Sequence, residues 1–496
     1  MVDGNINSRR MWVLLTALVV ISSCVFIWDS FRDDYFCKFD SPVYATISQN
    51  ILRTGDWLNL RSSFDAPFEN NHPPLVFWAT AISLKLLGEN AFAVAFFSIL
   101  CAIGTCIVLF FIGTFLKNEY VGFFSAIGLI LTRYVPRVAR YNTLEIPLMF
   151  FIALSVLFLI LALNKNRIFY ILFGLSTALC ILSKGVIGFS PFVICFFAIL
   201  FQKRYKDFFS LSFIMGIFLA LALPCVWLFL KGGCTVEGTS QVLSGYLHFA
   251  LPAFTGSENR GNAGTRLFFI QKLIETCFMI MPGVVLGLFF LGREVIREKR
   301  RELLVILVWA LMFIIGYSIS SWRRAFYLLP MYPAMALLFG IGLYEIIPKT
   351  YSKWSVYLIM AFFVGNISAP FLFSPWAPKK PKGVIARRVN FPRARKAVKA
   401  LYKQFPGGMR FVAYNQRDPN EFIFFFRSEF DIELCEKEEE FKKLVISEEP
   451  ILFYISKYNF SGMDKRVYEK LKIVYAFNDQ LIATNQQEAI PVFDVE

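Results

Sequence analysis

Charged side chains are scarce in this sequence: they make up 18% of its 496 residues, whereas 56% are hydrophobic and 57 residues are Phe. Soluble domains carry about 25% charged residues, so this composition, with a mean hydropathy of +0.55, excludes a soluble globular protein and indicates a membrane protein. The sequence also lacks a basic, aromatic-studded face on a soluble domain, which argues against nucleic-acid binding. Its net charge of +15 instead fits cationic loops that face anionic membrane lipids.

Further absences narrow the class of protein. The first hydrophobic run follows Arg9 and Arg10 as in a signal peptide, but it has no small-residue cleavage site, so we expect a retained helix. The ten cysteines show no spacing that supports a disulfide framework, and most lie in hydrophobic runs as small apolar residues. A Cys37–Cys234 disulfide between two outer segments stays open. No internal repeat of fixed period is present.

Hydrophobic runs of about twenty residues recur from Met11 to Phe373, and each can cross roughly 30 Å of hydrocarbon. They predict an α-helical polytopic membrane protein with about eleven, and up to about thirteen, transmembrane helices. The expected spans are 11–29, 92–116, 119–135, 147–163, 168–183, 186–201, 208–229, 267–291, 303–320, 326–345 and 355–373. The apolar segment 73–88 is shorter, and we expect it to lie along the outer interface with Trp78 at headgroup level.

Lys and Arg residues mark one side of the membrane. If the N-terminus is cytoplasmic, the cytoplasmic connections carry Arg9, Arg10, Lys117, Lys165, Arg167, Lys203, Arg204, Lys206, Arg293, Arg297, Lys299, Arg300, Arg301, Lys349 and Lys353. This bias is the one expected for a multi-pass protein of the inner membrane. An odd number of spans then places the C-terminal part outside, although the basic segment 379–403 runs against that assignment.

The composition changes at Ser374. We therefore expect a transmembrane domain over residues 1–373, with a first outer loop at 30–91, and a soluble extracytoplasmic α/β domain over residues 374–496. About 120 residues suffice for one such domain. Its expected strands are 411–414, 451–455, 473–475 and 480–484, and its expected helices are 420–427 and 463–471.

Polar residues that suit catalysis fall on the expected outer side, where charged side chains at the membrane boundary are costly and often functional. Asp40 precedes a helical stretch at 44–52, so it is either a helix cap or a base or metal ligand at the membrane surface. His72 precedes Pro73 and Pro74 at the start of the interfacial helix. A lone loop histidine is more often a surface or capping residue than a functional one, so its role stays open.

Cationic side chains accompany these residues. A short outer loop carries three arginines and a carboxylate: Arg133, Arg137, Arg140 and Glu145. They either pair with one another and with lipid phosphates, or they hold a phosphorylated substrate, since guanidinium binds phosphate bidentately. Arg323 and Arg324 are adjacent on the same side, and Lys184 lies between two closely connected spans. A polyprenyl phosphate head group at the leaflet surface would account for these cations.

Several motifs occur in one order along the chain. They are Asp40-x3-Tyr44-Ala, Gly55-Asp56-Trp57, Pro73-Pro74-Leu75-x2-Trp78, Thr143-Leu144-Glu145-Ile-Pro147, Ser183-Lys184-Gly185 and Tyr327-x2-Pro330-x2-Pro333. This order resembles the polyprenyl-phosphate-sugar-dependent glycosyltransferases of the protein O-mannosyltransferase superfamily, which are of the GT-C type. It is nearer to the bacterial branch that includes the lipid A aminoarabinose transferase, and the C-terminal run from Phe411 to Phe453 is also similar to that branch's outer domain.

The resemblance implies roles for single residues. Asp40 corresponds to the catalytic carboxylate, and Glu145 to a second acidic residue that is more often Asp in the family. His72 stands where the family often has a phosphate-contacting Lys, and Ser41 stands where an acidic residue is common. His248 matches a histidine that is a metal-ligand candidate in some members, so the resemblance leaves a divalent metal cofactor open.

We therefore expect inverting transfer of a sugar from a polyprenyl (undecaprenyl) phosphate to lipid A, another glycan or a protein, at the outer face of the inner membrane. Asp40 and Glu145 are the expected catalytic carboxylates. The expected substrate- or phosphate-binding residues are Tyr44, His72, Arg140, Lys184, Arg323 and Arg324. The alternatives are a transporter or flippase, which would show inverted repeats and helices broken at mid-membrane, an O-antigen polymerase or ligase with a large late outer loop, and a non-catalytic membrane anchor.

Overall fold

The computed structural model describes most of the membrane domain and the core of the C-terminal domain. The described residues are 8–28, 30, 40–61, 72–132, 134–250, 267–319, 323–346, 403, 409–414, 432–435, 437–456, 467, 469–477 and 480–486. The expected span 355–373, the helix 420–427 and most of the helix 463–471 lie outside the described residues, so these expectations stay predictions. Cys37, one half of the expected disulfide, lies outside them as well.

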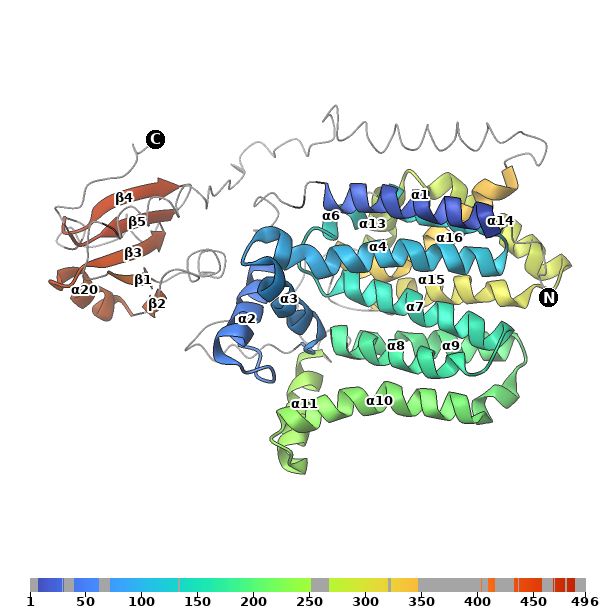
Figure 1. Cartoon of the computed structure of the whole chain (residues 1–496), viewed down its shortest axis with the longest axis horizontal. Helices are drawn as coiled ribbons and strands as arrows, with labels where there is room; N and C mark the ends of the chain where they lie inside the picture. Colours follow the sequence, from blue (N-terminus) through green and yellow to red (C-terminus); the bar gives the residue numbers. More distant parts are fainter. Residues whose placement is uncertain are drawn as a thin grey trace.

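Long apolar helices lie side by side along one axis and form a bundle (Figure 1). They are α1 (Ser8–Ile27), α4 (Ala91–Leu116), α5 (Glu119–Leu131), α7 (Glu145–Asn164), α8 (Phe169–Lys184), α9 (Ser190–Phe201), α10 (Leu211–Lys231), α15 (Leu304–Ile319) and α16 (Tyr332–Ile346). Short helical turns in the connections are α6 (Val135–Val138), η3 (Tyr205–Phe209), η4 (Arg301–Leu303) and η5 (Ala325–Met331).

Seven described segments are long and apolar enough to cross a membrane, or eight if one bent pair counts as a single span. One of the seven, Phe169–Phe201, contains both α8 and α9. The predicted α-helical polytopic fold is therefore confirmed. The expected total of about eleven spans stays a prediction.

Side-chain caps explain where several bundle helices begin. Asn90 caps α4 by accepting a hydrogen bond from the backbone N–H of Ala93 at 2.8 Å. Asn118 caps α5 and Ser210 caps α10 in the same way. Such caps satisfy N–H groups that the first turn of a helix leaves unpaired. The polar residues between the hydrophobic runs therefore set the helix starts.

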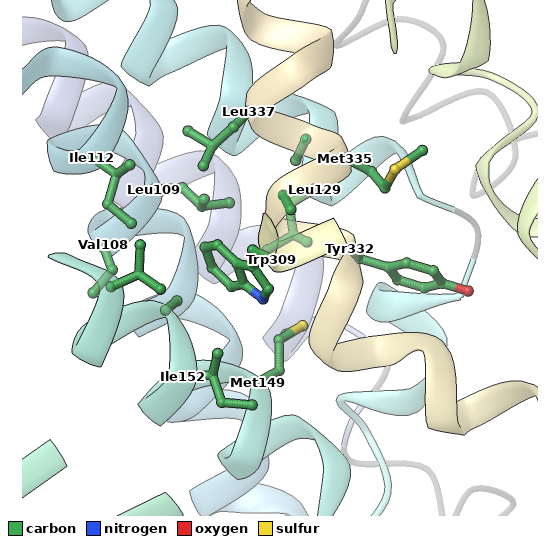
Figure 2. Close-up of a cluster of buried hydrophobic side chains, with 14 of the residues drawn as sticks. Val108, Leu109, Ile112, Leu129, Met149, Ile152, Trp309, Tyr332, Met335 and Leu337 are labelled. Atoms are coloured by element: carbon green, nitrogen blue, oxygen red, sulfur yellow. The ribbon is translucent and has the colours of Figure 1, made fainter. Parts of the chain in front are cut away.

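The centre of the bundle is a close-packed apolar core around the buried indole of Trp309 on α15 (Figure 2). Core side chains from neighbouring helices include Leu109, Leu129, Met149, Ile152 and Leu337. The Trp309 Nε1–H donates a hydrogen bond to the backbone oxygen of Pro330 at 2.9 Å. Elsewhere small residues let helices approach closely: a Cβ added to Gly174 on α8 would lie 1.9 Å from the backbone oxygen of Gly216 on α10.

Two connections bend sharply within apolar sequence. The expected span at 267–291 is not one straight helix, because this segment forms α13 (Phe268–Cys277) and α14 (Met281–Arg297), which are bent by 106°. Whether the bent pair crosses the membrane as one span stays a prediction. Pro282 lies in the first turn of α14, where it has no N–H with which to continue the hydrogen bonds of α13. The chain also turns back between α8 and α9 through η2 (Gly185–Phe189), where Gly188 packs against the backbone of Ile181.

Two short helices, α2 (Ser41–Thr54) and α3 (Leu75–Leu87), lie at one end of the bundle, which we call the α2–α3 end (Figure 1). They share a hydrophobic cluster that includes Tyr44, Phe77 and, from the start of α7, Leu144. The amphipathic α11 (Val236–Ala250) lies at the same end (Figure 1). The expected helices at 44–52 and 73–88 are therefore confirmed as helices, whereas their position at a membrane interface stays a prediction.

The opposite end of the bundle carries Lys and Arg residues that the sequence assigns to the cytoplasm. Lys117 Nζ lies 2.5 Å from Oε1 of Glu294 on α14, whose Oε2 lies 2.9 Å from the Arg300 guanidinium. On the neighbouring helices, the buried carboxylate of Asp207 lies 2.7 Å from the guanidinium of Arg167. These connections, predicted to share one side of the membrane, do share one end of the bundle. The compartment that this end faces stays a prediction.

The described part of the C-terminal domain contains a mixed sheet and one helix. Its strands are β1 (Arg410–Tyr414), β2 (Ile432–Cys435), β3 (Ile451–Ser456), β4 (Lys472–Phe477) and β5 (Gln480–Thr484), in the order β2-β1-β3-β5-β4. β1 pairs in parallel with β2 and β3, and β5 pairs antiparallel with β3 and β4. α20 (Glu438–Ile446) places Phe441 on Tyr414, with ring centroids 3.8 Å apart. The expected strands are confirmed, whereas the sequence analysis missed β2 and α20.

Candidate active site

Tyr44 lies at the centre of the residues that the sequence singles out. It is buried on α2, and its ring meets the rings of His72 and Phe77 edge to face, with centroids 6.2 and 5.2 Å away. Burial and the nearby carboxylates of Asp40 and Glu145 raise the pKa of Tyr44 well above its usual value. The phenol therefore stays protonated and can donate a hydrogen bond.

Asp40 stands at the start of α2 but does not cap the helix. Its backbone oxygen accepts the hydrogen bond from Tyr44 N at 3.0 Å, while its carboxylate accepts none from the first turn. The residue is exposed, so its carboxylate is accessible from outside the bundle. A purely capping role therefore does not account for Asp40. The next residue ties this turn to α7, because Asn142 N donates a hydrogen bond to Ser41 Oγ at 3.1 Å.

Glu145 and Lys184 form an ion pair between the first residue of α7 and the last residue of α8. Lys184 Nζ donates a hydrogen bond to Glu145 Oε1, and the exposed fractions of the two side chains are only 9% and 8%. The ammonium also lies 4.5 Å from the ring centroid of Tyr327 and 5.9 Å from that of Phe326, in cation–π geometry. Glu145 is thus a buried carboxylate whose charge Lys184 compensates.

His72 joins the site through the turn that precedes α3. Gly185 has a φ of +63°, which a residue with a side chain rarely adopts, and a Cβ at this position would lie 3.7 Å from Pro73. The chain therefore leaves α8 beside the turn that carries His72. Burial and the positive charge of Lys184 lower the pKa of His72 to about 3. The imidazole is therefore neutral at physiological pH. It can form hydrogen bonds with a phosphate but does not supply the charge of the lysine that the family often has there.

The two adjacent arginines precede η5. Arg324 is exposed, its guanidinium carbon lies 5.9 Å from the ring centroid of Phe326, and its positive charge opposes the rise in the pKa of Tyr44. Arg323 is half-buried in the same segment. The structure thus brings together six of the residues expected from the sequence, around Tyr44: Asp40, Tyr44, His72, Glu145, Lys184 and Arg324.

Two other expected residues are placed differently. Arg140 is buried, and its Nη2–H donates a hydrogen bond to the backbone oxygen of Val25 at 3.0 Å. It thereby satisfies a carbonyl in the last turn of α1, where a positive charge is favourable. His248 is exposed on α11. Within the described ranges, no three His, Cys, Asp or Glu side chains come together as a metal site would require, and the metal role of His248 stays a prediction.

Tyr44 was expected in the site, but three further aromatic residues, Tyr317, Phe326 and Tyr327, were not. Tyr327 was quoted as part of a motif without a role, yet its ring carries the Lys184 ammonium and stacks on Tyr317, with centroids 5.6 Å apart. The Phe326 ring lies in cation–π geometry with both Lys184 and Arg324. The aromatic pair directly after Arg324 was a usable signal, whereas nothing in the sequence around Tyr317 distinguishes it from a lipid-facing aromatic residue.

The chain is similar in sequence and fold to known proteins. Residues 71–228 match the model of the dolichyl-phosphate-mannose-protein mannosyltransferase family. An uncharacterized protein of Aquifex aeolicus is 26% identical over 298 residues, covering 60% of this chain and 57% of that protein. The undecaprenyl phosphate-α-4-amino-4-deoxy-L-arabinose arabinosyl transferase 2 of Pseudomonas fluorescens is 26% identical over 313 residues, covering 61% of this chain and 55% of that protein. The matches thus span little more than half the length of these relatives.

The fold is shared more widely than the sequence. The crystal structure of ArnT from Cupriavidus metallidurans, bound to undecaprenyl phosphate, aligns with a TM-score of 0.73 at 15% identity and covers 97% of this chain and 99% of that one. At this identity the likeness concerns the fold alone. The resemblance to the polyprenyl-phosphate-sugar-dependent glycosyltransferases of the GT-C type, expected from the order of the motifs, is therefore confirmed by the family model over residues 71–228 and by the fold over nearly the whole chain.

Proposed function

We propose that this protein is an integral-membrane glycosyltransferase that moves a sugar from undecaprenyl or another polyprenyl phosphate to lipid A, another glycan or a protein. One observation carries the proposal: an exposed carboxylate, a buried Glu145–Lys184 pair and Arg324 surround Tyr44 at one end of an apolar bundle. The site therefore offers a base and cations where a lipid head group would lie. The relative named as an arabinosyl transferase and the fold shared with a protein bound to undecaprenyl phosphate support this reading.

Asp40 is the base in this proposal. An acceptor hydroxyl gives its proton to the Asp40 carboxylate while its oxygen attacks the anomeric carbon, and the bond from that carbon to the phosphate oxygen breaks. Attack from the side opposite the phosphate inverts the anomeric centre, through an oxocarbenium-like transition state. Asp40 suits this role better than Glu145, because an acceptor can reach the exposed Asp40, whereas Glu145 is buried.

The leaving group is the lipid phosphate, which needs charge stabilisation more than a proton. Arg324, with Arg323 beside it, supplies positive charge at the accessible edge of the site, and Lys184 supplies it from within. Fixed donors of this kind contribute on the order of 2–4 kcal/mol each to transition-state stabilisation. His72 contributes a neutral hydrogen bond. The residues described here provide no metal site, and no step in this mechanism depends on a metal.

The site is proposed to face the outer side of the inner membrane. The Lys and Arg connections gather at the other end of the bundle, and such connections face the cytoplasm in multi-pass proteins. The N-terminus would then be cytoplasmic and the C-terminal domain extracytoplasmic. Labelling of single cysteines introduced at exposed positions of α2 and of the 203–206 turn, in intact cells with an impermeant reagent, distinguishes the two orientations.

The replacement Asp40→Asn tests the reaction. Purified protein in lipid vesicles is supplied with undecaprenyl phosphate carrying labelled 4-amino-4-deoxy-L-arabinose, mannose or glucose, and with lipid A or a membrane glycan extract. The variant should insert normally and lose at least about 100-fold in transfer rate. Asp56→Asn is the matched control in the same loop, because the Asp56 carboxylate accepts hydrogen bonds within its own turn, from Leu58 N and Asn59 N at 3.0 Å and from Asn59 Nδ2 at 2.8 Å. Near-normal turnover of Asp40→Asn would contradict the assignment of the base.

A further inference from the structure

Tyr317 carries a buried hydroxyl that no described residue satisfies. The residue lies on α15 and is 6% exposed, and its Oη has no hydrogen-bond partner among the described residues. Nearly all buried polar side chains in folded proteins have a partner, because an unmet hydroxyl in an apolar environment is unfavourable. This hydroxyl is therefore available to a bound ligand.

The ring of Tyr317 is held so that its hydroxyl cannot turn elsewhere. It stacks on Tyr327, with ring centroids 5.6 Å apart and an interplanar angle of 16°, and on Phe313, at 5.9 Å and 25°. The Phe269 ring packs against it in a tilted arrangement, at 5.7 Å and 33°. Phe269 comes from α13, so residues from three separate segments fix one phenol ring. A ring that is fixed this firmly presents its hydroxyl in one direction.

The stack connects this hydroxyl to the candidate active site. Tyr327, the neighbour of Tyr317 in the stack, has the Lys184 ammonium 4.5 Å from its ring centroid, and Lys184 pairs with Glu145. The Glu145 carboxylate lies near enough to act electrostatically on the Tyr317 hydroxyl. Tyr317 thus belongs to the bundle core and adjoins the Glu145–Lys184 pair through Tyr327.

Two further buried groups near Glu145 are also without partners among the described residues. They are Asn142 Nδ2 and Thr143 Oγ1, whose residues are 1% and 5% exposed and directly precede the start of α7. The backbone N–H of Asn142 is bonded to Ser41, the neighbour of Asp40. Asn142 and Thr143 therefore bring neutral hydrogen-bonding groups without described partners to the start of α7, where Glu145 stands.

We propose that the Tyr317 hydroxyl binds a hydroxyl or amino group on the sugar of the lipid-linked donor. This inference rests on the proposed function. A sugar substituent both donates and accepts hydrogen bonds, so it can bridge a phenol and a carboxylate. A phosphate fits this position less well, because Arg324, which holds the phosphate in the proposed mechanism, lies at the exposed edge of the site, whereas Tyr317 is buried. Tyr317 is accordingly a sugar-binding residue, not a phosphate-binding one.

The test compares Tyr317→Phe with the wild type in the full-length protein. Binding of undecaprenyl phosphate alone, and of undecaprenyl phosphate carrying 4-amino-4-deoxy-L-arabinose, mannose or glucose, is measured in nanodiscs. For the sugar that the wild type binds best, Tyr317→Phe should bind the loaded lipid about tenfold more weakly, as expected for one lost hydrogen bond. Its affinity for undecaprenyl phosphate alone should stay within about twofold of the wild type.

Tyr332→Phe is the matched control. The Tyr332 hydroxyl is buried like that of Tyr317 but lies 2.7 Å from Thr276 Oγ1, so its loss removes a hydrogen bond that the protein already makes. Without lipid, Tyr332→Phe should lower the melting temperature, whereas Tyr317→Phe should leave it unchanged or raise it, because it removes an unmet polar group. Tyr332→Phe should keep the donor affinity of the wild type.

Three results would overturn the inference. They are an unchanged affinity of Tyr317→Phe for the sugar-loaded lipid, an equal loss of affinity for undecaprenyl phosphate alone, and a fall in melting temperature as large as that of Tyr332→Phe. If the wild type binds neither form of the lipid, the proposed function fails and the inference fails with it. If the wild type binds the loaded lipid and Tyr317→Phe binds it equally well, only the inference fails.

Discussion

Replacing Lys184 by Met removes one half of a buried ion pair and leaves the other half in apolar surroundings. The exposed fractions of the Lys184 and Glu145 side chains are 9% and 8%. Removing one partner of such a pair costs about 3–5 kcal/mol of folding free energy, because the remaining charge is uncompensated. Glu145→Gln should cost less, because the ammonium keeps its place over the Tyr327 ring, a contact of about 0.5–2 kcal/mol.

Unfolding titrations in mixed micelles, followed by tryptophan fluorescence, measure these costs. The set comprises Lys184→Met, Glu145→Gln and the double variant, and the double variant should be more stable than the sum of the single losses predicts, by about 0.5–3 kcal/mol. Lys272→Met is the control, because Lys272 pairs with Glu275 on the surface of α13, where their side chains are 35% and 58% exposed. That pair is worth about 1 kcal/mol or less. Equal losses for Lys184→Met and Lys272→Met would refute the reasoning.

Three other predictions follow from the same structure. Arg324→Ala should weaken binding of the lipid donor about 10- to 100-fold, as loss of a charged hydrogen bond does, and an unchanged Michaelis constant for the donor would contradict this. Burial and Lys184 lower the pKa of His72 to about 3, whereas the unfolded chain binds that proton below about pH 6.5, so stability falls as the pH drops from 6.5 toward 3. His72→Gln should flatten this part of the pH dependence of stability. Identical stability profiles of His72→Gln and the wild type from pH 7 to pH 4 would contradict the lowered pKa of His72. Gly174→Ala should lower the free energy of unfolding by about 1–3 kcal/mol, because its Cβ would meet the backbone of Gly216. Gly245→Ala, with open space around it among the described residues, should not destabilise the protein. Equal melting temperatures of the two variants would disprove the close contact at Gly174.

Much of the fold was predictable because hydrophobic length and polar caps are local signals. The runs at 92–116 and 147–163 became α4 and α7 to within two residues, with the cap of α4 at Asn90. The segment 267–291 was misread because hydropathy registers apolar content and not direction. A proline in the first turn of a helix is compatible with a straight span or a sharp bend, and the packing of α13 and α14 against different neighbours decides between them.

The candidate site was predictable in its members but not in its contacts. The order of motifs named Asp40, Glu145 and Lys184, yet no spacing shows that residues 39 positions apart form a buried ion pair. Nor does it show that Arg140 donates a hydrogen bond to α1. Such contacts depend on which helix ends meet in space. The neutral state of His72 likewise depends on burial and on Lys184, which the sequence alone does not reveal.

Buried polar groups without a hydrogen-bond partner are distributed unevenly between the two ends of the bundle. At the end opposite α2 and α3, the buried charges are compensated: Lys117 lies between Glu294 and Glu345, and Asp207 pairs with Arg167. Buried polar groups that have no hydrogen-bond partner among the described residues lie at the α2–α3 end and in the adjoining half of the bundle. They belong to Ser98, Asn142, Thr143, Ser190, Trp227 and Tyr317. Among the described residues, no such group lies at the opposite end.

This difference indicates that the end with paired charges serves stability, whereas the α2–α3 end serves function. A bundle whose buried charges are paired gains rigidity at that end, whereas unmet donors and acceptors lower stability unless something binds them. Selection tolerates such a cost mainly at sites that take a ligand, because binding then supplies the missing hydrogen bonds. The sugar-loaded donor should therefore raise the melting temperature of the wild type by more than it raises that of a variant in which Asn142, Thr143 and Tyr317 are replaced by Leu, Val and Phe. Equal stabilisation of both proteins would mean that these groups are met by water or lipid and not by the sugar.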